Sequence, residues 1–167
     1  MTSDLISLSA RAVRDLLKDR QVTPLELLEA LETRIAEVNG PVNALPTLCF
    51  ERARARALEQ DFSTLPLAGI PIVIKDLLTV SGVRTTFGSM AYRDHVPKAS
   101  DLLVERIEAA GGIVYAKSNT PEFGAGANTF NDVFGFTRNP WNTALSAAGS
   151  SGGSAVALAT GMAWIAT

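Results

Sequence analysis

The spacing of apolar residues in the first third of the chain predicts helices. Residues 8–20 carry their apolar side chains on one face of a 3.6-residue period, so we expect an amphipathic helix there. A second helix is expected after Thr23, because a proline suits the first helical position and Glu26 completes a capping box. The sequence Asn-Gly-Pro at 39–41 is expected to end it, and residues 52–60 predict a third, more exposed helix.

Beyond Pro66 the pattern becomes that of a buried parallel sheet. Residues 67–74 are apolar and largely β-branched, which is typical of a strand covered on both faces, and residues 113–116 repeat this composition. A helix capped by Ser100 and running to about Ala110 would connect the two strands. A strand, a crossover helix and a second strand predict a parallel pair and therefore an α/β fold.

The rest of the chain predicts shorter elements. Residues 79–83 suggest a short strand and turn, residues 120–123 the start of a helix, and the asparagine-rich stretch 128–142 a loop. An apolar helix is expected over 155–162, followed by the start of a strand at 164–167.

The domain organisation is expected to be incomplete. No cap, polar tail or closing turn follows the apolar element that ends at Thr167, which would leave a sheet strand half built. We therefore expect residues 1–167 to be the N-terminal portion of one domain. Its first part, 1–65, would be helical, and 66–167 would begin the α/β core.

Composition excludes several classes of function. The 167 residues are 47% hydrophobic, enough for a core, and 15 basic against 17 acidic side chains give a net charge of −2. That balance does not favour direct nucleic-acid binding, which needs a basic face. His95 and Cys49 are the only residues of their kinds, so an intrachain Cys/His zinc site or disulfide cannot form. No secretory or membrane-spanning pattern is seen, and we expect a cytoplasmic protein without membrane contact, metal or cofactor.

The first candidate for chemistry is Lys75, which ends the apolar run 70–74. A charged amine beside buried aliphatic side chains is costly, so the pKa of Lys75 is expected to be depressed. The neutral amine would then be a competent general base. The alternative is a strand-end lysine that reaches water or pairs with Asp76, and the residues alone leave both interpretations open.

The second candidate is the Gly/Ser-rich segment 149–154 before the apolar helix. Its glycines permit a turn whose N–H groups would bind an oxyanion, whereas a phosphate loop would need a lysine that is absent. Residues 149–153 also match the pattern G-x-S-x-G, in which Ser151 would be the nucleophile of an α/β-hydrolase. That fold needs a histidine after the serine, but His95 precedes it, so this interpretation fails within the chain. Lysine is the known alternative base for serine chemistry, and a flexible linker is the structural alternative.

Four blocks in this order carry a family resemblance: GIPIVIKD at 69–76, KSNTPEF at 117–123, TRNPWN at 137–142 and GSSGGSA at 149–155. Together they resemble the amidase signature family over about residues 8–167. The resemblance implies part of the amidase signature fold, a mixed sheet flanked by helices that is incomplete in this chain. It also implies hydrolysis of a carboxamide to a carboxylate and ammonia or an amine, through an acyl-enzyme formed by a Ser–cis-Ser–Lys triad.

The resemblance assigns roles to individual residues. Lys75 matches the catalytic lysine, and Ser150 matches the bridging serine, which follows a cis peptide bond and also contacts the substrate. Gly124 matches a substrate-binding position, and Ser154 is expected to cap a helix rather than to react. Support of the serine turn is expected from four neighbours: Gly149, Ser151, Gly152 and Gly153.

The chain departs from the family in two respects. The acylated serine and the oxyanion hole of the family fall beyond Thr167, so the isolated chain is expected to be inactive unless a second polypeptide completes the domain. Residues 147–148 are Ala-Ala where many relatives have Pro-Gly. Three functions stay open: an amidase acting on a small-molecule amide, the amidase subunit of a glutamyl/aspartyl-tRNA amidotransferase, and a non-catalytic truncated remnant. A homodimer is a further open possibility.

Overall fold

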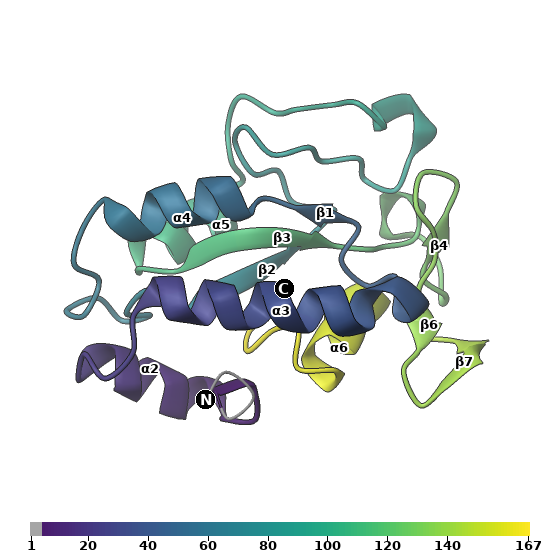
Figure 1. Cartoon of the computed structure of the whole chain (residues 1–167). Coiled ribbons are helices and arrows are strands. Elements are labelled where there is room, and N and C mark those ends of the chain that lie inside the picture. The colour runs from purple at the N-terminus through teal and green to yellow at the C-terminus, as the bar shows by residue number, and fades with distance from the viewer. Residues whose placement is uncertain (1–4) are drawn as a thin grey trace.

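A mixed three-stranded sheet lies at the centre of the molecule (Figure 1). The computed structural model describes residues 5–167, and its central strands lie in the order β1-β3-β2. As predicted, β2 (Pro71–Lys75) and β3 (Ile113–Ser118) are parallel, and every residue of both is buried. The short strand β1 (Thr47–Leu48) was not predicted; it pairs with β3 in the antiparallel direction and makes the sheet mixed.

The other edge of β2 carries residues 165–167. Val73 donates its N–H to the carbonyl of Ile165 at 3.1 Å and accepts from the N–H of Thr167 at 3.1 Å, which forms a parallel bridge. The strand start predicted for 164–167 is therefore present only as an isolated bridge at Ala166. The continuous run of Ile and Val in β2 is buried throughout, as expected for a strand that is covered on both faces.

The two N-terminal helices are confirmed, although the first begins two residues after the predicted position and ends two residues before the predicted end. In α2 (Ala10–Lys18), the Ser9 hydroxyl accepts from a backbone N–H of the first turn, and Val13 and Leu17 are buried. In α3 (Pro24–Val42), the capping box is confirmed, with hydrogen bonds in both directions between its threonine and its glutamate.

The predicted end of α3 at 39–41 is wrong, because the helix continues to Val42. The Asn39 carboxamide oxygen accepts from the N–H groups of Ala44 and Leu45, each at 3.0 Å. Asn43 closes the helix in the left-handed conformation, with its N–H bonded to the Asn39 carbonyl. These bonds satisfy the helix end and the chain that leaves it, so Pro41 is tolerated in the last turn.

The remaining helices surround the sheet, and some of their predicted starts are shifted. α4 (Phe50–Leu58) begins two residues before the expected position. α5 (Leu102–Ala109) follows Asp101, and Ser100 is not its cap, because the Ser100 hydroxyl accepts from the N–H of Ser81 instead. α6 (Gly152–Ala159) begins three residues earlier than predicted, inside the serine-rich segment.

Two predictions for the irregular regions need correction. Residues 120–123 do not open a long helix but lead into a short 3₁₀ turn, η2 (Glu122–Gly124), because Phe123 and Gly124 both have positive φ. Residues 79–83 form a turn closed by a single bridge between Val80 and Val83.

The stretch predicted as an asparagine-rich loop contains two small hairpins. One pairs β4 (Phe130–Asn131) with β5 (Gly135–Phe136), and the other pairs β6 (Arg138–Asn139) with β7 (Asn142–Ser146). Figure 1 shows the hairpins beyond the end of β3, on the side where α6 begins.

One hydrophobic core joins the helices to the sheet. Its largest fully buried apolar side chains come from the N-terminal helices, the two parallel strands and the segments next to them: Val13, Leu27, Leu28, Leu31, Leu45, Ile70, Ile72, Ile74, Ile113, Tyr115 and Met162. Within residues 5–167, no helix is both long enough and apolar enough to cross a membrane.

Candidate active site

Lys75 and the serine pair meet at the carboxyl end of β2. The Lys75 Nζ donates to the Ser150 Oγ at 2.9 Å and to the Ser151 Oγ at 2.9 Å. The Lys75 backbone N–H donates to the Thr167 Oγ1 at 2.8 Å, so the end of β2 is held by the neighbouring segment. The structure thus brings together two segments that lie 75 residues apart in sequence.

The environment of Lys75 shifts its amine toward the neutral form. The side chain is only 8% exposed, and desolvation lowers the pKa of its amine, as the sequence predicted. Its hydrogen-bond partners are hydroxyl groups, which carry no charge to offset the loss of water. Over the described part of the chain, no ion pair links Lys75 to a carboxylate, so the alternative of a pair with Asp76 is not realised.

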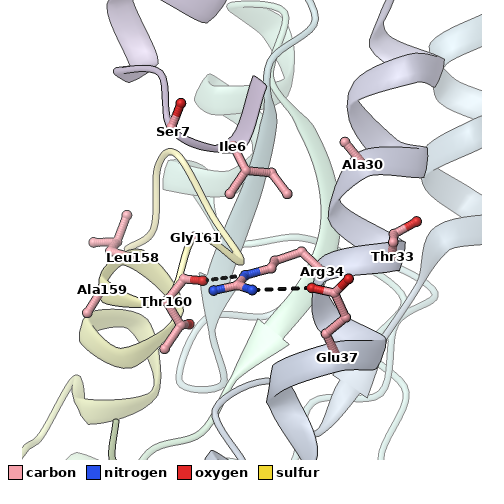
Figure 2. Close-up of a pocket in the computed structure, with 10 residues that line it drawn as sticks. All are labelled: Ile6, Ser7, Ala30, Thr33, Arg34, Glu37, Leu158, Ala159, Thr160 and Gly161. Carbon is pink, nitrogen blue, oxygen red and sulfur yellow. Dashed lines mark hydrogen bonds and ion pairs between the residues drawn. The ribbon is translucent and has the colours of Figure 1, made fainter. Parts of the chain in front are cut away.

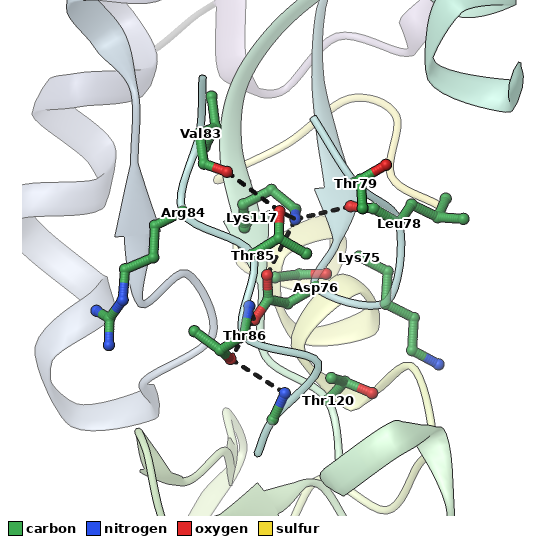
Figure 3. A network of polar contacts seen from close by, with 12 residues as sticks. Lys75, Asp76, Leu78, Thr79, Val83, Arg84, Thr85, Thr86, Lys117 and Thr120 are labelled. Carbon is green, nitrogen blue, oxygen red and sulfur yellow. Dashed lines mark hydrogen bonds and ion pairs between the residues drawn. The ribbon is translucent and has the colours of Figure 1, made fainter. Parts of the chain in front are cut away.

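Asp76 instead pairs with Lys117, a residue that the sequence reasoning missed. Their charged groups are 2.9 Å apart, and both side chains are almost completely buried. Lys117 also donates to the Leu78 carbonyl and the Thr85 hydroxyl, each at 2.8 Å. Figure 3 shows the Lys75 amine pointing away from this network. The polar run that follows the apolar residues of β3 was the sequence signal that could have indicated Lys117.

A second set of contacts fixes the Asp76 carboxylate. The Thr86 hydroxyl donates to it at 2.6 Å and the Thr86 backbone N–H at 3.0 Å (Figure 3). Burial lowers the pKa of Lys117, and the charge of Asp76 opposes that shift. The adjacent residues Lys75 and Asp76 therefore belong to two separate clusters, one of hydroxyls and one of opposite charges.

The serine turn has the backbone form that the resemblance implied. The Gly149–Ser150 peptide bond is cis, and Ala148 before it has a φ of +59°. The Thr129 hydroxyl donates to the Ala148 carbonyl at 2.8 Å and accepts from the Gly152 N–H at 3.0 Å. The sequence reasoning did not identify Thr129, and no local pattern indicated it.

The glycines of the turn allow close packing. A Cβ on Gly152 would lie 2.3 Å from the Thr129 Oγ1, and a Cβ on Gly153 would lie 2.5 Å from the backbone nitrogen of Asn119. Gly124 packs similarly against Leu77, where a Cβ would lie 2.6 Å from Cδ1. This contact concerns packing, so substrate binding by Gly124 stays a prediction.

The expectation that Ser154 caps a helix is wrong. Ser154 lies inside α6 and is buried, and its hydroxyl donates to the Thr167 carbonyl at 2.6 Å. The Ser118 hydroxyl at the end of β3 lies 2.7 Å from it. A helix, a strand and the final segment converge on this hydroxyl, which explains why it does not face the helix N-terminus.

Two cavities lie near these elements but differ in their relation to the serine turn. The larger, about 510 Å³, lies between α3 and the end of α6, where Arg34 donates to the Thr160 carbonyl at 2.8 Å and bonds Glu37 (Figure 2). The smaller, about 270 Å³, is lined mainly by residues 121–132. Ala127 in its wall packs against the position of Gly149, so this second cavity adjoins the turn. Among residues 5–167, no group of three or more His, Cys, Asp or Glu side chains is arranged to hold a metal ion.

Comparison with known sequences points to one family. The family model described as Amidase matches residues 26–167. The chain is 42% identical over 162 residues to one subunit of the glutamyl-tRNA(Gln) amidotransferase of Roseiflexus sp. (strain RS-1), and the match covers 94% of this chain and 33% of that protein. The chain therefore spans about a third of the length of the curated relatives it matches.

Solved structures give the same result. The 6-aminohexanoate cyclic dimer hydrolase is 32% identical with a TM-score of 0.86, and the match covers 95% of this chain and 33% of that one. A bacterial aryl acylamidase of the amidase signature family is 28% identical with a TM-score of 0.86, covering 93% of this chain and 34% of that one. The fold of this chain thus corresponds to about a third of the architecture of each of these enzymes.

Proposed function

Because this chain belongs to the amidase family, we propose that it supplies the lysine base and the bridging serine of a serine amidase. The reaction is hydrolysis of a small-molecule carboxamide to a carboxylate and ammonia or an amine, without a cofactor and in the cytoplasm. The observation that carries the proposal is the contact of the buried Lys75 Nζ with the Ser150 Oγ at 2.9 Å.

The geometry supports a proton relay through Ser150. An uncharged lysine amine has two N–H donors and one lone pair. It can therefore donate to the Ser151 hydroxyl while its lone pair accepts the proton of Ser150. Ser150 in turn takes the proton of the attacking serine, which adds to the amide carbon and gives a tetrahedral intermediate. Ser150 then donates a proton to the nitrogen as the C–N bond breaks and recovers one from Lys75, which leaves the acyl-enzyme. Water later releases the carboxylate.

The attacking serine and the oxyanion hole would come from outside these 167 residues. Loss of a single oxyanion donor raises a barrier by about 2.7–4 kcal/mol, so the chain alone is expected to be inactive. A second polypeptide or a downstream segment would complete the domain.

The test is amide hydrolysis by the complete protein that contains this chain, measured as ammonia release from simple aliphatic and aryl amides. The Lys75→Ala variant should lose this activity. Lys98→Ala, which changes an exposed lysine, is the matched control. Hydrolysis at the normal rate by Lys75→Ala would overturn the proposal.

A second candidate function is the amidase subunit of a tRNA-dependent amidotransferase. It is favoured by the 42% identity to a protein named as part of a glutamyl-tRNA(Gln) amidotransferase. The relay would be the same, but the substrate would be glutamine and the ammonia would pass to a partner protein. Glutaminase activity together with a co-purifying tRNA-binding protein would support this function over a free-standing amidase. If the complete protein hydrolyses neither glutamine nor simple amides, a non-catalytic remnant becomes the better description.

A further inference from the structure

The helix that follows the serine turn is not capped by its own N-cap residue. Ser151 occupies the N-cap position of α6 but makes no side-chain cap hydrogen bond. Its hydroxyl accepts instead from the Lys75 Nζ at 2.9 Å. The first N–H groups of a helix have no partner within the helix, so α6 needs an acceptor from elsewhere.

Thr129 supplies this acceptor from the start of the first hairpin. Its side chain is fully buried, and its Oγ1 accepts from the N–H of Gly152, the first residue of α6, at 3.0 Å. The same hydroxyl donates to the Ala148 carbonyl at 2.8 Å, and the Thr129 backbone N–H donates to that carbonyl at 2.9 Å. Thr129 therefore holds the turn on both sides of the two serines.

The surrounding residues fit this role. Gly149 and Gly152 both approach the Thr129 hydroxyl, and a Cβ at these positions would lie 3.2 Å and 2.3 Å from it. The backbone carbonyl of Thr129 accepts from the N–H of Thr137 at 2.9 Å, which fixes Thr129 to the next strand. The backbone of Thr129 is thus fixed to the neighbouring strand. Its hydroxyl fills the space left by the absent side chains of Gly149 and Gly152.

We propose that Thr129 is a positioning residue for the proton relay. Its hydroxyl bonds both the N–H of Gly152 and the carbonyl of Ala148, and this fixes the turn so that the Ser151 hydroxyl stays against the Lys75 amine beside Ser150. The structural part of the proposal concerns this chain alone, whereas its catalytic consequence rests on the proposed function.

The structural part is tested by crystal structures of the Thr129→Val and Thr129→Ser variants of this chain. Valine keeps the shape of threonine but removes the hydroxyl, so the turn should lose its two side-chain hydrogen bonds to Thr129 and Ser151 should shift. Its Oγ should then leave hydrogen-bond distance of the Lys75 Nζ. Serine keeps the hydroxyl and should preserve both contacts of Lys75. A valine variant that retains both 2.9 Å contacts would overturn the proposal.

The catalytic part is tested in the complete protein. Thr129→Val should lower kcat about 10- to 100-fold with little change in KM, because displacement of a catalytic group by about 1 Å can cost that much. Thr129→Ser should restore kcat to within about threefold of the original. Equal losses in the valine and serine variants would overturn a role for the hydroxyl. If the valine variant does not fold, Thr129→Cys, similar in size and a weak donor, takes its place.

A double variant tests whether Thr129 acts through Ser151. If it does, adding Thr129→Val to Ser151→Ala should lower kcat no further than Ser151→Ala alone. Additive losses would contradict this route. Thr160→Val is the control, because it removes a threonine hydroxyl that bonds the Val156 carbonyl at the other end of α6, and this variant should keep its kcat.

The outcomes separate this proposal from the proposed function. Absence of amidase activity in the unaltered complete protein would overturn the proposed function, and the crystal structures would still decide the role of Thr129 in the serine turn. Normal activity with unchanged Lys75 contacts in Thr129→Val would overturn the present proposal alone.

Discussion

Two buried lysines at the ends of adjacent parallel strands have opposite surroundings. Lys117 on β3 forms an ion pair with Asp76 at 2.9 Å and also donates to a carbonyl and a threonine hydroxyl. Lys75 on β2 donates to two serine hydroxyls and lies in no ion pair within the described residues. Burial lowers the pKa of both amines, but only at Lys117 does a carboxylate oppose the shift.

We expect this difference to separate a structural lysine, Lys117, from a reactive one, Lys75. A buried ammonium beside a carboxylate is held in its charged form, and removal of either partner leaves an uncompensated charge. A buried amine among hydroxyls gives up its proton more readily and can take another from a neighbour. Asp76 is the carboxylate next to Lys75 in the sequence, but it accepts a hydrogen bond from Lys117 instead.

The largest expected effect comes from removing the lysine of the serine cluster. In the complete protein, Lys75→Met should lower kcat by about 10⁴-fold or more, because members of a catalytic relay act as a unit. Its free energy of unfolding should not fall, since a desolvated amine is replaced by an apolar side chain of similar length. Ammonia release and urea denaturation measure the two quantities. A stable Lys75→Met variant with normal kcat would show that Lys75 is not the reactive lysine of the two.

The reverse pattern is expected at the ion pair. Lys117→Met should lower the free energy of unfolding by about 3–5 kcal/mol, because the Asp76 carboxylate stays buried without its partner. Urea denaturation of this chain measures the loss. The double variant Lys117→Met/Asp76→Leu should recover much of it. If the single variant is as stable as the original chain, the pair is not a structural element.

The pH dependence should also differ between the clusters. The folded pKa of Lys75 lies below its unfolded value, so the unfolded chain binds more protons in the interval between them. The contribution of Lys75 to stability is therefore least favourable below the folded pKa and improves as the pH rises toward the unfolded value. Lys75→Met should remove this slope from a series of urea denaturation curves. In the complete protein, kcat/KM should rise as the pH passes through the folded pKa of Lys75 and level off above it.

The smallest expected effect concerns the link between the serine helix and the sheet. Ser154→Ala removes the hydrogen bond to the Thr167 carbonyl and leaves the Ser118 hydroxyl without that neighbour. A loss of about 1–3 kcal/mol in the free energy of unfolding is expected for such a buried group. Thermal denaturation of this chain measures it, and an unchanged melting temperature would show that these bonds do not stabilise the sheet edge.

Local sequence patterns were sufficient for the elements whose causes are local. The capping box at Thr23 and the apolar run of β2 depend on residues within a few positions of one another, and both were predicted. The depressed pKa of Lys75 followed from the same run. The end of α3 was missed because the Asn39 carboxamide bonds the chain beyond the helix, which a proline signal does not indicate.

Contacts between distant segments could not be read from local patterns. Thr129 meets Gly152 across 23 positions, and Lys117 meets Asp76 across 41. The regular repeat of a helix or a strand does not relate residues this far apart in sequence, so local patterns do not indicate these contacts. The two-residue strand β1 is likewise too short to show alternation, and its pairing depends on the position of β3. The resemblance located Lys75 and Ser150, whereas the structure was needed to find what holds them.

Titration of the Lys75 amine in this chain tests most directly whether its surroundings make it a base. With ¹³C-labelled lysine, the side-chain signals can be followed by NMR against pH, and the Lys75→Met variant identifies the signal that belongs to Lys75. We expect this signal to titrate at a lower pH than lysine in the urea-unfolded chain. A folded chain in which Lys75 titrates at or above the unfolded value would contradict the claim that desolvation among hydroxyls prepares this amine to accept a proton.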